Sequence, residues 1–143
     1  MELVQLGFDK IMQMRTYTVI VLKGHNPDQE EGEETKFAIY VDSSVGKTLQ
    51  MYLTDIEKPR PQTHDLISSI FKGLEVRVKQ VIINDVQDTI YYARLFLEQY
   101  RGDLRHIVEI DCRPSDCITL ALMHNAPVYC NKEVLEKVIP IIE

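Results

Sequence analysis

The fold class is decided by residues 76–98, which read VRVKQVIINDVQDTIYYARLFLE. Apolar and β-branched residues recur at alternate positions through 76–83 and again through 90–98, and this period of two is typical of half-buried strands. The polar residues 84–88 between them are typical of a turn. The stretch therefore predicts two neighbouring strands joined by a short connection, which is an antiparallel hairpin.

Further strands and helices are expected on both sides of this hairpin. Within it, the apolar register shifts between Val78 and Val81, which indicates either a β-bulge or burial of both faces. Strand patterns also occupy 3–8, 17–22, 37–41, 106–110 and 128–130, and helical patterns start near Ser43, Thr63 (as N-cap), Pro114 and Glu133. Hairpins outnumber strand–helix–strand units. We therefore expect one compact α+β domain over residues 1–143, with a mostly antiparallel or mixed sheet and three to four helices.

Charge is placed unevenly along the chain. The formal net charge is −6, and residues 28–34 contribute five acids and no base, which leaves −1 for the rest. We expect residues 24–35 to form a solvated acidic loop and residues 139–143 a short C-terminal tail. No broad basic surface is present, so nucleic acid would have to bind at a local basic site or through a bridging metal ion.

The subcellular location is inferred from the absence of membrane-spanning and signal-peptide patterns and from the number of cysteines. No run approaches the roughly 20 apolar residues that cross a bilayer, and the first residues do not resemble a signal peptide. Cys112, Cys117 and Cys130 are odd in number, so at least one thiol stays unpaired within the chain. We expect a cytoplasmic protein without membrane contact, whose cysteines act as buried small hydrophobic residues rather than zinc ligands.

Two polar clusters carry the residues suited to chemistry. They consist of Arg60, Thr63, His64 and Asp65, and of Asp111, Arg113, Ser115 and Asp116. Each lies at the start of an expected helix, where backbone N–H groups can bind an anion. Arginines and carboxylates in such places can hold a phosphate and a divalent metal, and histidine can act as a base near neutral pH. The chain has no glycine-rich phosphate loop, so no nucleotide or organic cofactor is expected.

Both clusters also have a purely structural interpretation. Serine, threonine and aspartate are ordinary residues at helix starts, and arginine–aspartate pairs often tie loops to a scaffold. A capping role explains Thr63 and Ser115 fully. It does not explain why Arg60 is held between two prolines or why the same combination recurs at Arg113, so both interpretations stay open.

Four motifs resemble the bifunctional nuclease domain family. They are PRPxTHDL at 59–66, YARL at 92–95, DxRPSDCIxLAL at 111–122 and APVY at 126–129. The resemblance runs in order over almost the whole chain. It implies a compact α+β fold, assembly as a homo-oligomer, and nuclease activity on DNA and RNA of the kind described for plant members.

The resemblance and the two clusters together suggest metal-assisted hydrolysis of phosphodiesters. In this hypothesis the catalytic residues are His64, Asp65 and Asp116. The two aspartates bind Mg²⁺ or Mn²⁺, and His64 is either the general base or a further metal ligand. The phosphate would be bound by Arg60, Thr63, Arg113 and Ser115. The alternative is a non-catalytic regulatory module that binds an anion or a partner with the same residues.

One segment departs from the pattern of the resembled family. Its members commonly carry Ile-Trp-Ile-Gly followed shortly by a glutamate at the start of the first helix. Here Tyr40 stands for the tryptophan, Asp42 for the glycine and Val45 for the glutamate. If that glutamate is a metal ligand, this chain has lost it unless Asp42 takes its place.

Overall fold

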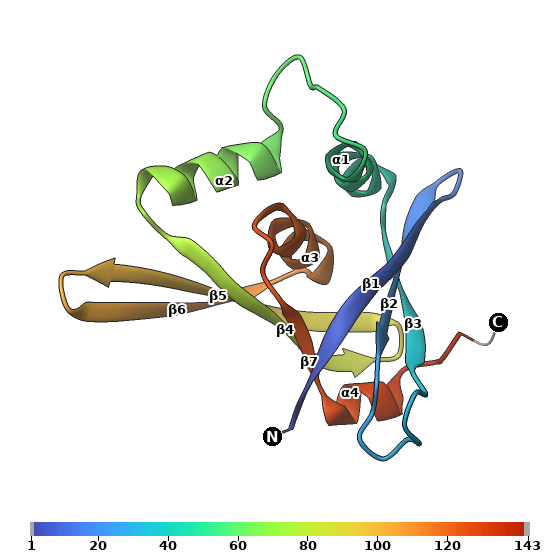
Figure 1. Cartoon of the computed structure of the whole chain (residues 1–143). Helices are drawn as coiled ribbons and strands as arrows, with labels where there is room; N and C mark the ends of the chain where they lie inside the picture. Colours follow the sequence, from blue (N-terminus) through green and yellow to red (C-terminus); the bar gives the residue numbers. More distant parts are fainter. Residues whose placement is uncertain (1, 142–143) are drawn as a thin grey trace.

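The computed structural model describes residues 2–141, in which seven strands and four helices follow one another (Figure 1). The strands are β1 (Leu3–Gln13), β2 (Tyr17–Gly24), β3 (Thr35–Asp42), β4 (Arg77–Gln87), β5 (Ile90–Arg101), β6 (Leu104–Cys112) and β7 (Val128–Asn131). The helices are α1 (Ser43–Leu53), α2 (Thr63–Gly73), α3 (Pro114–Met123) and α4 (Lys132–Lys137).

All seven strands form one sheet in the order β3-β2-β1-β7-β4-β5-β6. Every neighbouring pair is antiparallel except β4 and β7, which are parallel. Consecutive strands pair as hairpins within the groups β1–β3 and β4–β6, and β7 joins the two groups. This mixed sheet with four helices confirms the predicted α+β class.

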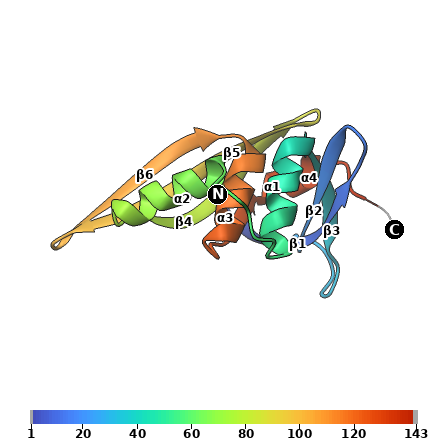
Figure 2. The same ribbon diagram turned by 90° about the horizontal axis from the view of Figure 1, so that it is seen from above.

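The helices pack on the strongly bent sheet at two places. Figure 1 shows α1, α2 and α3 gathered at one end of the molecule and α4 at the other end, next to β7, and buried residues of α1, α3 and α4 belong to one core. The core between these layers is closed by Phe37, Leu49, Ile83 and Ile118, none more than 1% exposed. Seen from above, α1, α2 and α3 lie next to one another (Figure 2), so residues from the starts of α2 and α3 can meet.

The position of α1 depends on a glycine. A Cβ on Gly46 would lie 1.9 Å from Thr18 Oγ1, which is far inside van der Waals contact. Thr18 is fully buried on β2, and its hydroxyl donates to Gln13 Oε1 at 2.7 Å. The missing side chain therefore lets α1 lie directly on β2.

The central hairpin is longer than the sequence predicted. β4 continues to Gln87 and β5 begins at Ile90, so the turn is Asp88-Thr89 and the expected turn at 84–88 is wrong. Asn84 lies at a register shift within the strand, where the bulge allows these polar residues to remain in the ladder. A second shift between Val78 and Gln80 confirms the bulge interpretation at that position.

The structure can be compared with the expected acidic loop at 24–35 and the expected C-terminal tail at 139–143. The acidic segment connects β2 to β3 as a hairpin loop. The proposed tail at 139–143 is described as far as Ile141, whose N–H donates to Lys36 O at 2.7 Å. Positions 142 and 143 lie outside the described residues. Among residues 2–141, no helix is long and apolar enough to cross a membrane.

Candidate active site

The start of α2 is fixed by its own backbone and one carboxylate. Gln62 has extended backbone angles and is the N-cap, while Thr63 is the first helical residue, so the predicted cap at Thr63 is wrong by one position. Gln62 N–H donates to Asp65 Oδ2 at 2.8 Å, and Gln62 Oε1 accepts from the Thr48 hydroxyl at 2.9 Å. Gln62 thus caps the N-terminus of α2 and links it to α1 through Thr48, and His64 lies in the first turn of α2.

Asp65 holds the loop before α2. Both of its carboxylate oxygens lie within 2.8 Å of Lys58 Nζ. The Lys58 hydrogen bond and, to a smaller extent, the Gln62 N–H lower the pKa of Asp65 below its usual value, against a desolvation cost. Asp65 is therefore ionised at neutral pH and committed to Lys58 and Gln62.

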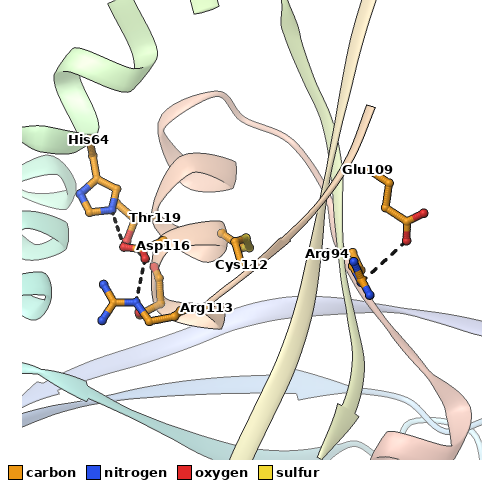
Figure 3. Close-up of a disulfide and its surroundings, with 9 residues drawn as sticks. His64, Arg94, Glu109, Cys112, Arg113, Asp116 and Thr119 are labelled. Atoms are coloured by element: carbon orange, nitrogen blue, oxygen red, sulfur yellow. Dashed lines mark hydrogen bonds and ion pairs between the residues drawn. A yellow bond between two sulfur atoms is a disulfide. The ribbon is translucent and has the colours of Figure 1, made fainter. Parts of the chain in front are cut away.

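A disulfide closes the segment before α3. Cys112 at the end of β6 is bonded to Cys117 in the first turn of α3, with their Cα atoms 6.5 Å apart (Figure 3). The expectation that both act simply as buried small hydrophobic residues is therefore wrong, because the short turn at Pro114 brings them within bonding geometry. Cys130 stays free and buried. The bonded loop contains both Arg113 and Asp116, so it restricts their backbone.

His64, Asp116 and Arg113 meet where α2 faces α3. His64 Nε2 lies 3.0 Å from Asp116 Oδ1, and Arg113 Nε donates to Asp116 Oδ2 at 2.9 Å (Figure 3). His64 is only 7% exposed, whereas the Arg113 side chain is 64% exposed. The hydrogen bond to Asp116 raises the pKa of Arg113, so its charge is permanent. The carboxylate thus orients the imidazole ring and one edge of the guanidinium group.

This trio borders an open cleft of about 670 Å³ between α1, α2 and the start of α3. Its other walls include Thr63 from α2 and Thr48 from α1, and Lys47 adds a second cation. Lys47 is exposed and forms no ion pair with any residue of the described chain. The cleft is thus a local basic site within an acidic protein, which suits a phosphate group.

The structure does not bring the other expected residues into this cleft. Arg60 is exposed on the loop before α2 and does not line the cleft. Ser115 is buried and borders a neighbouring hollow, where its backbone oxygen accepts from the Thr119 hydroxyl at 2.8 Å. Val45 lines the cleft in the place of the expected glutamate, whereas Asp42 borders the neighbouring hollow. Asp42 therefore does not replace a cleft carboxylate.

The fit of a divalent metal depends on these positions. Within residues 2–141, no group of three or more histidine, cysteine, aspartate or glutamate side chains could hold a metal ion. Asp65 is occupied by Lys58, which leaves His64 and Asp116 as the converging ligands. Magnesium commonly binds through one or two carboxylates together with substrate phosphates. A magnesium or manganese requirement therefore stays a prediction in which Asp116 would be the protein carboxylate.

Sequence reasoning missed several residues that build the site. Gln62 and Asp65 are three residues apart, and this spacing at a helix start is itself a signal for a reciprocal cap. Lys47 is exposed and Thr48 is half-buried on α1, but only the packing of α1 beside α2 places them at the cleft. No sequence signal identifies that packing.

Fold and cleft together define a small α+β domain with a histidine–carboxylate pair next to basic side chains. A family model for the bifunctional nuclease domain matches residues 28–141. The chain belongs to this family, which confirms the resemblance recognised in its motifs.

The relatives include bacterial and plant proteins. An uncharacterized protein of Mycobacterium tuberculosis is 28% identical over 126 residues, which are 88% of this chain and 69% of that protein. Bifunctional nuclease 1 of Oryza sativa subsp. japonica is 27% identical over 115 residues, 80% of this chain and 33% of the relative. Bifunctional nuclease 2 of Arabidopsis thaliana is 27% identical over 116 residues, 81% of this chain and 33% of the relative. The chain thus spans about a third of the plant nucleases it matches.

Proposed function

We propose that this chain is a nuclease that hydrolyses phosphodiester bonds of DNA or RNA in the cleft between α1, α2 and α3. The observation that carries the proposal is the meeting of His64, Asp116 and Arg113 at the edge of a basic cleft. Membership of the bifunctional nuclease domain family and the names of the plant relatives support it.

His64 is assigned the role of general base. When His64 Nε2–H donates to Asp116, the Nδ1 atom keeps its lone pair, and the described chain offers it no hydrogen-bond partner. Nδ1 can therefore take a proton from a water that attacks phosphorus, while the bond from phosphorus to the leaving oxygen breaks and that oxygen takes a proton from solvent water. Asp116 stabilises the resulting imidazolium, as carboxylates do in histidine–carboxylate pairs.

Arg113 and Lys47 are assigned to the phosphate. Only Nε of Arg113 is used by Asp116, so its two terminal nitrogens remain for a phosphate oxygen. The N-terminus of α2 at Thr63 adds the positive end of a helix dipole. A bound Mg²⁺ or Mn²⁺ would supply further charge neutralisation at the phosphate oxygens.

The activity can be tested with a labelled single-stranded oligonucleotide, purified protein and Mg²⁺ or Mn²⁺. We expect cleavage that is lost in His64→Ala and in Asp116→Ala, and that EDTA abolishes. His25→Ala removes an exposed histidine of the loop between β2 and β3, outside the cleft, and is the matched control, which should cleave normally. Full activity of the His64→Ala protein would overturn the proposal and indicate a contaminating nuclease.

A non-catalytic anion-binding module is the second candidate. It is favoured by the fact that Asp116 is already paired with both His64 and Arg113 and that Val45 replaces the expected glutamate. In this case the same oligonucleotide binds to the cleft but is not cleaved in the presence of either metal ion. Weaker binding by Arg113→Ala, without cleavage by the wild-type protein, would establish the module instead of the enzyme.

The implied homo-oligomer is part of the proposal, and two groups of exposed apolar residues support it. Leu66 and Ile70 on α2 and Leu74, its C-cap residue, follow one another at intervals of four and are all about half exposed. Strand β6 is the last strand of the sheet, and its Leu104 and Val108 are also exposed. Groups of exposed large apolar side chains often mark protein contacts.

The edge of β6 is complementary to itself. If two copies paired antiparallel with Val108 opposite its counterpart, Arg105 of each copy would face Asp111 of the other, because both lie three positions from the centre. We propose a two-fold dimer through this edge. Val108→Lys would place two like charges at the centre, so it should convert the dimer to a monomer in light scattering; a wild-type monomer would refute the dimer.

A further inference from the structure

Arg113 lies between two depressions of the surface. On one side it lines the cleft that contains His64 and Asp116. On the other side it lines a second hollow of about 260 Å³, bordered by the outer edge of β3, the turn between β4 and β5, and the start of α3. The hollow is somewhat smaller than the roughly 300–1,000 Å³ of pockets for drug-sized ligands, so it suits one small group. A phosphate on Arg113 would thus be next to an unassigned site.

Two aromatic rings border this second hollow. Tyr40 on β3 is 60% exposed, and its ring is held edge-on to Tyr17 with centroids 5.8 Å apart. Tyr91 on β5 is stacked on the fully buried Phe37 at 5.6 Å with an interplanar angle of 21°. Rings fixed by such contacts lose little entropy when a flat ligand stacks on them.

The rest of the hollow offers hydrogen-bonding groups. β3 is the last strand on its side of the sheet, so within residues 2–141 no strand pairs with the outer side of its residues 39–42. Asp42 also borders the hollow, close enough to Arg113 to influence it electrostatically. Carboxylate and carbonyl oxygens accept from the exocyclic amines of nucleobases, and backbone N–H groups donate to base carbonyls. Stacking rings, base-edge acceptors and a phosphate-binding arginine therefore occur in one place.

We propose that this second hollow is a nucleobase subsite, which binds the base next to the phosphate held by Arg113. This inference rests on the proposed nuclease function and deepens it. A base reaches the hollow only when it is unstacked, so the preferred substrate is single-stranded nucleic acid. Arg113 then links two functions: its guanidinium group holds the phosphate between His64 on one side and the bound base on the other.

The experiment compares two labelled single-stranded oligonucleotides that differ only in one abasic residue next to the cleavage position. Binding is measured by fluorescence anisotropy on the His64→Ala protein, and cleavage on proteins with His64 intact. We expect Tyr40→Ala to weaken binding of the complete strand by roughly 10-fold to 100-fold, as lost base stacking does, and to leave the abasic strand unchanged. Tyr40→Trp keeps a stacking ring and should restore affinity.

Tyr100→Ala is the matched control. Tyr100 is also 60% exposed but lies near the end of β5, outside the hollow. Tyr100→Ala should change the affinity for neither the complete nor the abasic strand. Equal effects of Tyr40→Ala on both strands, or none on either, would overturn the subsite.

The two proposals fail in different ways. Cleavage by the wild-type protein that does not depend on the base overturns the subsite alone. Base-dependent binding without cleavage overturns the nuclease and retains the subsite. If neither strand binds and an extended peptide instead perturbs the amide signals of residues 39–42, β3 is an edge for peptide pairing and the subsite is wrong.

Discussion

Replacing Gly46 by alanine should destabilise the protein, although alanine is the better helix former. The added Cβ would meet Thr18 Oγ1 at 1.9 Å, so either α1 moves away from β2 or Thr18 changes rotamer and loses its bond to Gln13. Overpacking costs about 1–3 kcal/mol, and the lost hydrogen bond adds roughly 0.5–1.5 kcal/mol. The gain in helix propensity offsets about 1 kcal/mol. The net loss of unfolding free energy is therefore about 2 kcal/mol.

Gly73 provides the matched control within the same chain. It is the last residue of α2, and nothing lies within 4 Å of a Cβ at that position. Gly73→Ala should be neutral or stabilise by up to about 1 kcal/mol. Urea titration at pH 7 measures both, and for a chain of this size each kcal/mol changes the melting temperature by roughly 2–4 °C. If Gly46→Ala is as stable as Gly73→Ala, the close contact of α1 with β2 is refuted, and with it the placement of Lys47 and Thr48 at the cleft.

Two further predictions concern stability. Hydrogen bonds from Arg105 and Arg77 lower the pKa of the buried Glu98 carboxylate below 4.5, so its stabilisation is complete above the unfolded pKa and is lost as pH falls through the folded pKa. The difference in unfolding free energy between wild type and Glu98→Gln should shrink from pH 7 to pH 3; a constant difference would contradict this. Dithiothreitol reduces the Cys112–Cys117 disulfide and should lower the unfolding free energy by roughly 2 kcal/mol. The unfolding free energy of the Cys112→Ser protein should not change on addition of dithiothreitol.

The class of the fold followed from the sequence because its signals are local. Alternation in 76–83 and 90–98 reports which side of a strand is buried, and that information survives without tertiary structure. The turn was misplaced because asparagine and aspartate favour turns but are also accommodated at a bulge, and only the pairing of β4 with β5 distinguishes the two. The sheet order, with β7 between β1 and β4, has no local signal.

The candidate site was predicted in part for a similar reason. Local spacing placed His64 and Asp116 each in the first turn of a helix, and the structure brings them to 3.0 Å of one another. Spacing could not reveal that Asp65 faces Lys58 instead, because which carboxylate turns toward which cation depends on how the loop before α2 folds back. The disulfide of Cys112 was missed because three cysteines alone do not specify a pairing.

The most direct test of the central claim is a double-mutant cycle on His64 and Asp116, with kcat/KM for a single-stranded oligonucleotide as the measurement. General base catalysis contributes about 10²–10⁴-fold, so His64→Ala and Asp116→Asn should each lower kcat/KM within that range. Because the two side chains act as one unit, the double variant should fall no further than the more damaging single variant. Losses that multiply in the double variant, or activity that survives both substitutions, would contradict the account.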